Sequence, residues 1–154
     1  MAQRTVINSL SGAVLSISAS LPATYDAAGY GATTLVFTAC GQVENFGNHG
    51  VTATVTEFTP IDTAVIAKVK GSKNYGTMST MFADLPSDAG QVILKTASES
   101  NARYSLKITY QDTSIHYLDV LVSKAEYQNS SVNDVLKFAV DFAICRAPVI
   151  VAQV

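Results

Sequence analysis

The side chains that could perform chemistry are few and widely spaced in this sequence. Neither of the two histidines, His49 and His116, has the partner three or four residues away that a metal site on a helix uses. The two cysteines, Cys40 and Cys145, are too few and too far apart for a disulfide scaffold. We therefore interpret the histidines as structural or surface residues, and we expect both cysteines to be buried thiols in a reducing compartment.

Nucleophilic and acid–base catalysis also find little support. Cys40 has no general base near it in the sequence, and no Gly-x-Ser-x-Gly segment suggests a serine hydrolase. Asp112 and Asp119 flank the start of an expected strand, where carboxylates are usually solvated rather than paired for catalysis. The glycine-containing segments 29–31 and 47–50 lack the spacing of a phosphate-binding loop. The sequence predicts a protein that is not an enzyme and that binds no metal or cofactor.

Composition and charge narrow the class of protein. Of 154 residues, 48% are hydrophobic and only 14% are charged, which excludes a disordered chain. The formal net charge of −2 leaves no excess of cations for phosphates, which disfavours nucleic acid as a primary ligand. Residues 1–5 do not resemble the start of a secretory signal, and no apolar run approaches the roughly 20 residues of a membrane-spanning helix. We expect a soluble protein without a membrane partner.

Alternation of apolar and polar residues predicts most of the secondary structure. Residues 103–110 alternate strictly, and residues 135–146 place Phe138 and Phe142 on one apolar face, as in strands with one side against a core. Further strands are expected at about 4–18, 33–40, 51–58, 64–70, 75–83, 114–127 and 148–153.

One segment has helical spacing instead. Pro86 opens a turn, Ser87 or Asp88 can cap, and apolar residues then recur at helical intervals, which predicts an amphipathic helix at about 87–98. The expected fold class is therefore mainly β: an antiparallel β-sandwich or barrel with one flanking α-helix and a long inter-strand loop or hairpin.

Charge is unevenly distributed along the chain. The stretch 64–83 contains three lysines and no acidic residue: Lys68, Lys70 and Lys73. Two interpretations are open, namely the solvated end of a hairpin or a contact with an acidic patch on another subunit. A nucleic-acid site would need more cations or interleaved exposed aromatic residues.

Several short segments, in the same order, resemble the major tail tube protein of long, non-contractile-tailed bacteriophages. These segments are 22–30 (PATYDAAGY), 41–47 (GQVENFG), 58–60 (FTP) and 70–76 (KGSKNYG). The resemblance is clearest over residues 22–94. It implies a β-sandwich-like subunit with a flanking helix, six copies of which close into a ring. Stacked rings would form the tube through which the genome leaves the virion.

The resemblance also implies where subunits meet. It makes residues 1–154 one domain, in which a long connection at about 41–75 reaches neighbouring subunits and the adjacent ring, and a segment at 1–20 can act as an N-terminal arm. The residues expected in these contacts are Glu44, Asn45, Phe46, His49, Lys68, Lys70 and Lys73. The implied partners are tail-tip or baseplate, tape-measure and tail-terminator proteins, in a virion tail assembled in the bacterial host cytoplasm.

A conduit for duplex DNA must let the genome slide without specific binding. Because phosphate contacts repeated along a tube would hold DNA by multivalent attachment, we expect a neutral or acidic lumen. Asp112, Asp119 and Asp141 are the candidates for that lining. Two alternatives remain: a monomeric or trimeric β-sandwich binding module, such as a virion decoration or receptor-binding domain, and a secretion-system tube protein of the same fold.

Overall fold

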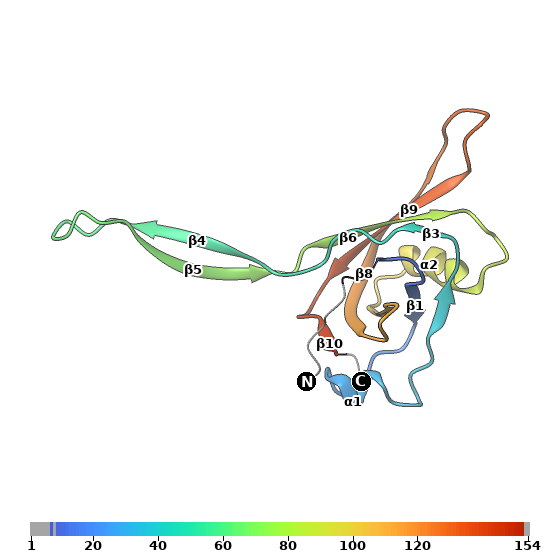
Figure 1. Cartoon of the computed structure of the whole chain (residues 1–154), viewed down its shortest axis with the longest axis horizontal. Coiled ribbons are helices and arrows are strands. Elements are labelled where there is room, and N and C mark those ends of the chain that lie inside the picture. The colour runs from blue at the N-terminus through green and yellow to red at the C-terminus, as the bar shows by residue number, and fades with distance from the viewer. Residues whose placement is uncertain (1–6, 8, 153–154) are drawn as a thin grey trace.

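A computed structural model of the chain describes residues 7 and 9–152, and its regular secondary structure consists mainly of antiparallel strands (Figure 1). One large sheet contains β1 (Val14–Ser18), β2 (Thr38–Cys40), β3 (Val43–Asn45), β6 (Thr77–Ala83), β7 (Tyr104–Thr109), β8 (Ile115–Gln128), β9 (Lys137–Ile144) and β10 (Val149–Val151). A separate hairpin consists of β4 (Thr52–Phe58) and β5 (Ala67–Asn74), and the helices are α1 (Ala27–Tyr30) and α2 (Ala89–Glu99). The mainly β fold class with a flanking helix is thus confirmed.

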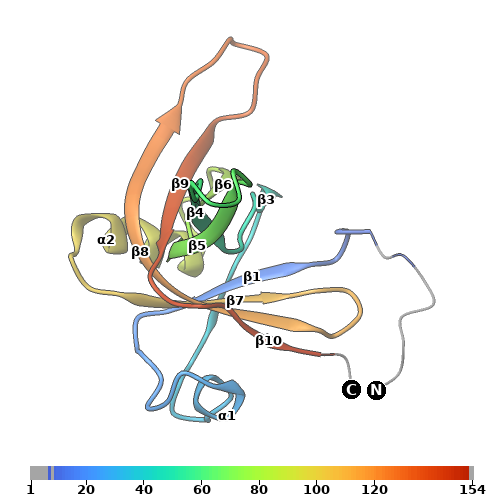
Figure 2. The same cartoon turned by 90° about the vertical axis from the view of Figure 1, so that its left-hand side faces the viewer.

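The large sheet is curled, so that its two ends come close to each other. Its strand order is β2-β1-β7-β8-β9-β6-β3, with β10 paired to the first residues of β8. β2 and β3 therefore lie at opposite ends of the order, yet only Gly41 and Gln42 separate them in the chain. Two residues span at most about 11 Å between the flanking Cα atoms, so the ends of the sheet must be close in space. Figure 2 shows the resulting curvature.

The core fills the inside of this curled sheet. The side chains of Phe82 and Phe138 stack there with ring centroids 5.0 Å apart. The larger of the almost fully buried apolar side chains are Leu15, Ile17, Met78, Phe82, Leu94, Leu106, Ile108, Leu118, Val120, Phe138, Val140 and Phe142. These side chains come from β1, β6, β7, β8, β9 and α2. Cys40 of β2 belongs to the same core and Val43 of β3 packs against it, so burial of the core holds together residues that are far apart in sequence.

Helix α2 ties the two ends of the sheet together. Its N-cap, Asp88, accepts hydrogen bonds from the backbone N–H of Gln91 (3.0 Å) and of Gly41 (2.9 Å). The fully buried amide of Gln91 donates to the carbonyl oxygens of Gly41 and Ala83, both at 3.0 Å, and accepts from the N–H of Leu85. One buried side chain thus connects the β2–β3 link, the end of β6 and the helix. Asp88 rather than Ser87 is the cap, so the helix begins two residues later than expected.

A second, smaller core covers the other face of β8. Tyr30 from α1 stacks on Tyr117 with centroids 4.9 Å apart, and Leu35 joins them. The expected strand 33–40 is shortened to Thr38–Cys40 because Leu35 and Phe37 belong to this second core instead. The short helix α1, which begins after its cap Asp26, was not expected from the sequence.

Three further expectations, on the first strand, the cysteines and membrane-spanning helices, can be compared with the structure. Within the described part of the first expected strand, 4–18, the strand covers Val14–Ser18; residues 1–6 and 8 of the proposed N-terminal arm lie outside the described residues. Cys40 is buried as expected, but Cys145 is exposed, because it follows the last residue of β9 at the edge of the core. Within residues 7 and 9–152, neither helix has the length and apolar character needed to cross a membrane.

Candidate interaction surface

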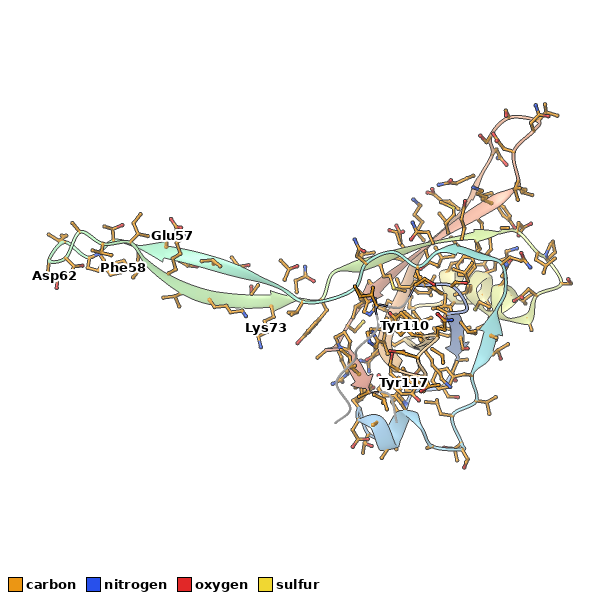
Figure 3. All side chains as sticks on the ribbon, viewed as in Figure 1. Glu57, Phe58, Asp62, Lys73, Tyr110 and Tyr117 are labelled. Carbon is orange, nitrogen blue, oxygen red and sulfur yellow. The ribbon has the colours of Figure 1, made fainter. Side chains whose placement is uncertain are left out.

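The β4–β5 hairpin projects away from the body of the protein (Figure 1). All residues of its two strands are exposed except Ala53, which is partly exposed. Figure 3 places Glu57, Phe58 and Asp62 toward the far end of the hairpin and Lys73 near its root. An isolated two-stranded ribbon is at best marginally stable in water, so this projection points to a partner.

The pairing register gives the hairpin one charged face. Residues opposite each other in antiparallel strands project to the same side, and β4 residues two apart share that side. Glu57 lies opposite Lys68, and their side chains form an ion pair of 3.2 Å. Lys70 lies opposite Val55 and Lys73 opposite Ala53, with an irregularity in the register between them. The three lysines predicted as contact residues therefore lie together on one face.

The opposite face of the hairpin is apolar and rich in threonine. Phe58 lies opposite Ala67, and Thr56 lies opposite Val69. Phe58 is 63% exposed and Val69 is 61% exposed, and the tip adds Ile61, Val65 and Ile66, which are also exposed. Several exposed apolar side chains on one face and at the tip of a hairpin are typical of an interaction site. We call the face formed by Thr52, Thr54, Thr56, Phe58, Ala67 and Val69 the apolar hairpin face.

The other residues expected in subunit contacts belong to the body. Glu44 on β3 forms an ion pair with Lys137 of β9 at 2.8 Å, and Asn45 accepts a hydrogen bond from the N–H of Gly47. Phe46 is only 8% exposed and packs in the main core, so in the single chain its side chain is not on the surface where a subunit contact was expected. Sequence alternation could not reveal this, because the segment at Phe46 is irregular.

Two of the three expected lumen residues are buried inside the subunit. The side chain of Asp119 is 0% exposed, and its Oδ2 accepts from Arg103 Nη1 (2.8 Å) and from Arg146 Nε (3.1 Å). Asp112 is 9% exposed and accepts hydrogen bonds from the N–H and hydroxyl of Ser114. Their assignment to a lumen surface is therefore corrected. Asp141 on β9 remains partly exposed opposite Ser79 of β6.

The buried Asp119 is part of a polar cluster that sequence analysis missed. The guanidinium of Arg146 stacks on the ring of Tyr25, with Cζ 3.9 Å from its centroid, and Arg103 contacts the Tyr25 hydroxyl at 3.4 Å. Burying a carboxylate is costly in free energy, and the two paired cations offset that cost for Asp119. The cluster fastens the segment before α1 to β7 and β8, which is a structural task.

The fold brings the two histidines together although 67 residues separate them. Nε2 of His49 and Nδ1 of His116 are 2.9 Å apart, which is hydrogen-bond distance. Burial lowers the pKa of His49, because desolvation disfavours the charged imidazolium. Among the described residues, no group of three or more His, Cys, Asp or Glu side chains is placed to hold a metal ion.

Comparison with known proteins gives a likeness in structure but none in sequence. No protein-family model and no curated protein matches this sequence. A chain of the PVC sheath/tube terminator from an extracellular contractile injection system superposes with a TM-score of 0.67 at 7% identity, covering 96% of this chain and 98% of that one.

Two other solved structures agree over most of the chain. A chain of the anti-feeding prophage baseplate superposes with a TM-score of 0.66 at 10% identity and covers 99% of both chains. A chain of the SPP1 tail tube gives 0.59 at 10% identity, covering 92% of this chain and 77% of that one. The chain therefore shares its fold with proteins of a phage tail tube and of phage-like injection particles.

Proposed function

We propose that this chain is a structural subunit of a phage or phage-like tail tube, built from stacked hexameric rings that form a conduit for genome delivery. The observation that carries the proposal is the apolar hairpin face, exposed on an arm that projects from a body with the fold of tube and terminator chains. In a stack of identical rings, each projecting arm meets another copy of the same subunit. A second copy is thus the partner that the hairpin requires.

The hairpin offers two means of attachment. Phe58, Val69 and the apolar tip can be buried against a neighbour, which supplies the free energy of association. The free edges of β4 and β5 carry unpaired backbone groups that can extend a neighbour's sheet. Lys70 and Lys73, on the charged face, then select an acidic surface of the adjacent subunit.

The lumen lining follows from the same arrangement. We place the hairpin lysines in subunit contacts or on the outer wall, and Asp141 with Ser79 on the candidate lumen surface. Such a neutral or acidic wall lets duplex DNA pass without specific binding. In this role the protein is not an enzyme. Its partners are tail-tip or baseplate, tape-measure and tail-terminator proteins. The tail is assembled in the bacterial host cytoplasm, and the protein then forms part of the virion tail.

A contractile or secretion-type particle is the second candidate. The chains from the baseplate and the sheath/tube terminator are covered over 99% and 98% of their length, whereas the SPP1 chain is covered over 77%. This agreement in length favours the tube or terminator of an injection particle over a long non-contractile tail. The assembly role is the same in both cases.

Electron microscopy of the purified full-length protein tests the proposal. We expect rings or tubes at high concentration or after seeding with a tail-tip complex. Val69→Asp should abolish them, because it places a charge on the apolar hairpin face. Val132→Asp is the control: Val132 is 97% exposed, but it lies between β8 and β9, outside the hairpin, so the same new charge there should leave assembly intact.

A hairpin truncation separates assembly from folding. Replacing residues 54–72 by Asn-Gly joins Ala53 to Lys73, which are paired in the hairpin, and should give a folded monomer. A deletion of 44–56, which the sequence alone suggests, would also remove Phe46 from the core. Monomers that persist in the wild type under both assembly conditions would overturn the proposal and favour a binding module.

A further inference from the structure

The root of the hairpin is held to the body at two successive points. At the first, the Thr80 hydroxyl donates to the carbonyl oxygen of Phe46 at 3.0 Å. Gly47 follows in the left-handed region, with φ +73°, where a Cβ would lie 2.2 Å from the carbonyl oxygen of Ser79. Beyond this point the chain continues through His49 to β4, and the second attachment is the contact between His49 and His116.

His116 is a rigid anchor for that second attachment. It lies in β8 and is paired on one side with Ile108 of β7 and on the other with Ile150 of β10. Its ring also meets the ring of Tyr110 edge-on at 4.8 Å. The ring of His49 lies nearly perpendicular to that of His116, with centroids 5.2 Å apart. The strand framework therefore fixes one imidazole, and the hairpin root carries the other.

The chemistry of two facing imidazoles makes this contact sensitive to protons. One contact nitrogen must carry a hydrogen and the other must be bare. A first added proton binds the far nitrogen of the donor ring and leaves the hydrogen bond intact and charge-assisted. A second proton must bind the bare contact nitrogen. It removes the acceptor and places two positive charges side by side, so the doubly protonated pair cannot keep the contact.

We propose that His49 and His116 form a proton-controlled clasp that fixes the root of the β4–β5 hairpin to β8 and releases it when both rings are protonated. Three other titratable groups lie beside the pair. The ring of Tyr110 contacts His116, and Asp112 lines one cavity together with these two residues. Tyr75 lines a second cavity together with His49. β10 contributes only the uncharged Ile150. The inference concerns the single chain and does not depend on the proposed function.

The sign of the pH effect follows from burial. In the closed clasp the pKa of His49 is lowered by desolvation, whereas an open root returns it toward the ordinary value of about 6.5. A group whose pKa is lower in the closed state than in the open state stabilises the closed state at pH values above the open-state pKa. This stabilisation is lost as the pH falls through the closed-state pKa. The clasp is therefore closed at neutral pH and opens in acid.

Hydrogen exchange of the monomeric full-length protein tests the clasp. After correction for intrinsic rates, we expect the amides of 48–52 to exchange at least about tenfold faster at about pH 4.5 than at about pH 7.5. In His116→Gln the difference in protection between the two pH values should be smaller, because no second imidazole can be protonated and only the desolvation of His49 still opposes its protonation. The neighbouring substitution Asn48→Ala should retain the wild-type response.

Two results would overturn the inference. One is wild-type protection of the root that does not change with pH, and the other is a response that persists unchanged in His116→Gln, which would assign it to Asp112 or another group. Histidine ring NMR of the wild type gives a second measurement that needs no variant. We expect two coupled titration steps, whereas two independent titrations near pH 6.5 would contradict the clasp.

Discussion

Gly90, at the start of α2, lies against the backbone of Cys40 in β2 so closely that an added Cβ would be 2.7 Å from both the Cα and the Sγ of Cys40. Because backbone atoms cannot yield as a flexible side chain can, Gly90→Ala must push the helix off β2. We expect a loss of about 1–3 kcal/mol in the free energy of unfolding, measured by denaturant titration. Gly50→Ala is the control, since none of the described atoms lies within 4 Å of its added Cβ.

Phe138 tests the main core. It is 1% exposed and stacks on Phe82, so Phe138→Ala should lower the free energy of unfolding by about 3–5 kcal/mol by creating a cavity. Val132→Ala, at a side chain that is 97% exposed, should change it by less than about 0.5 kcal/mol. A similar loss in both variants would mean that the core does not lie where the structure places it.

The hairpin lysines test the lumen proposal. Lys68→Glu combined with Lys70→Glu should weaken the stacking of rings, which would be seen as shorter tubes and a higher protein concentration needed for assembly. The double variant should still fold, because the exposed Lys68–Glu57 ion pair contributes less than about 1 kcal/mol to the free energy of unfolding. Lys124→Glu, which removes another exposed ion pair on β8, is the control. Intact tubes should show no salt-sensitive binding of duplex DNA. Low-salt affinity that the hairpin changes abolish would instead place these lysines inside the lumen.

The two thiols should differ in reactivity. Burial raises the pKa of Cys40 to about 12, so it remains a protonated, inaccessible thiol at neutral pH. The pKa of Cys145 is raised by partial burial and by the charge of Asp119, but this thiol is exposed. A disulfide reagent at about pH 8 should modify one thiol in the native protein and both after unfolding. Cys145→Ser should remove the native reaction, and Cys40→Ser should leave it.

The sequence predicted those elements whose pattern is local. The alternation in residues 135–146 correctly placed Phe138 and Phe142 in the core. The helix expected at 87–98 is found at Ala89–Glu99, because cap, turn and apolar spacing all lie within one short segment. α1 has only four residues, too few to establish a helical period, and its cap alone gave no distinct signal.

The candidate site depended on contacts that no local pattern contains. Asp119 sits at a polar position of an alternating strand, which suggested solvent. A second core covers that side, together with Arg103, just before β7, and Arg146, just after β9. The histidine pair forms because the curled sheet brings β8 beside the hairpin root, and spacing within the sequence could not reveal that. The two faces of the hairpin follow from its register, which is set only once the strands pair.

The central position of β9 has a consequence for the order in which the protein folds. β9 pairs with β8 on one side and with β6 on the other, yet it follows both in the chain. During synthesis, β6 and β8 therefore emerge before the strand that joins them, and each exposes a long unpaired edge until β9 arrives. Such non-local pairing is slow, on the order of milliseconds to seconds. This interval is when nascent chains are most vulnerable to aggregation, and when chaperones would have most effect on the yield of native subunits.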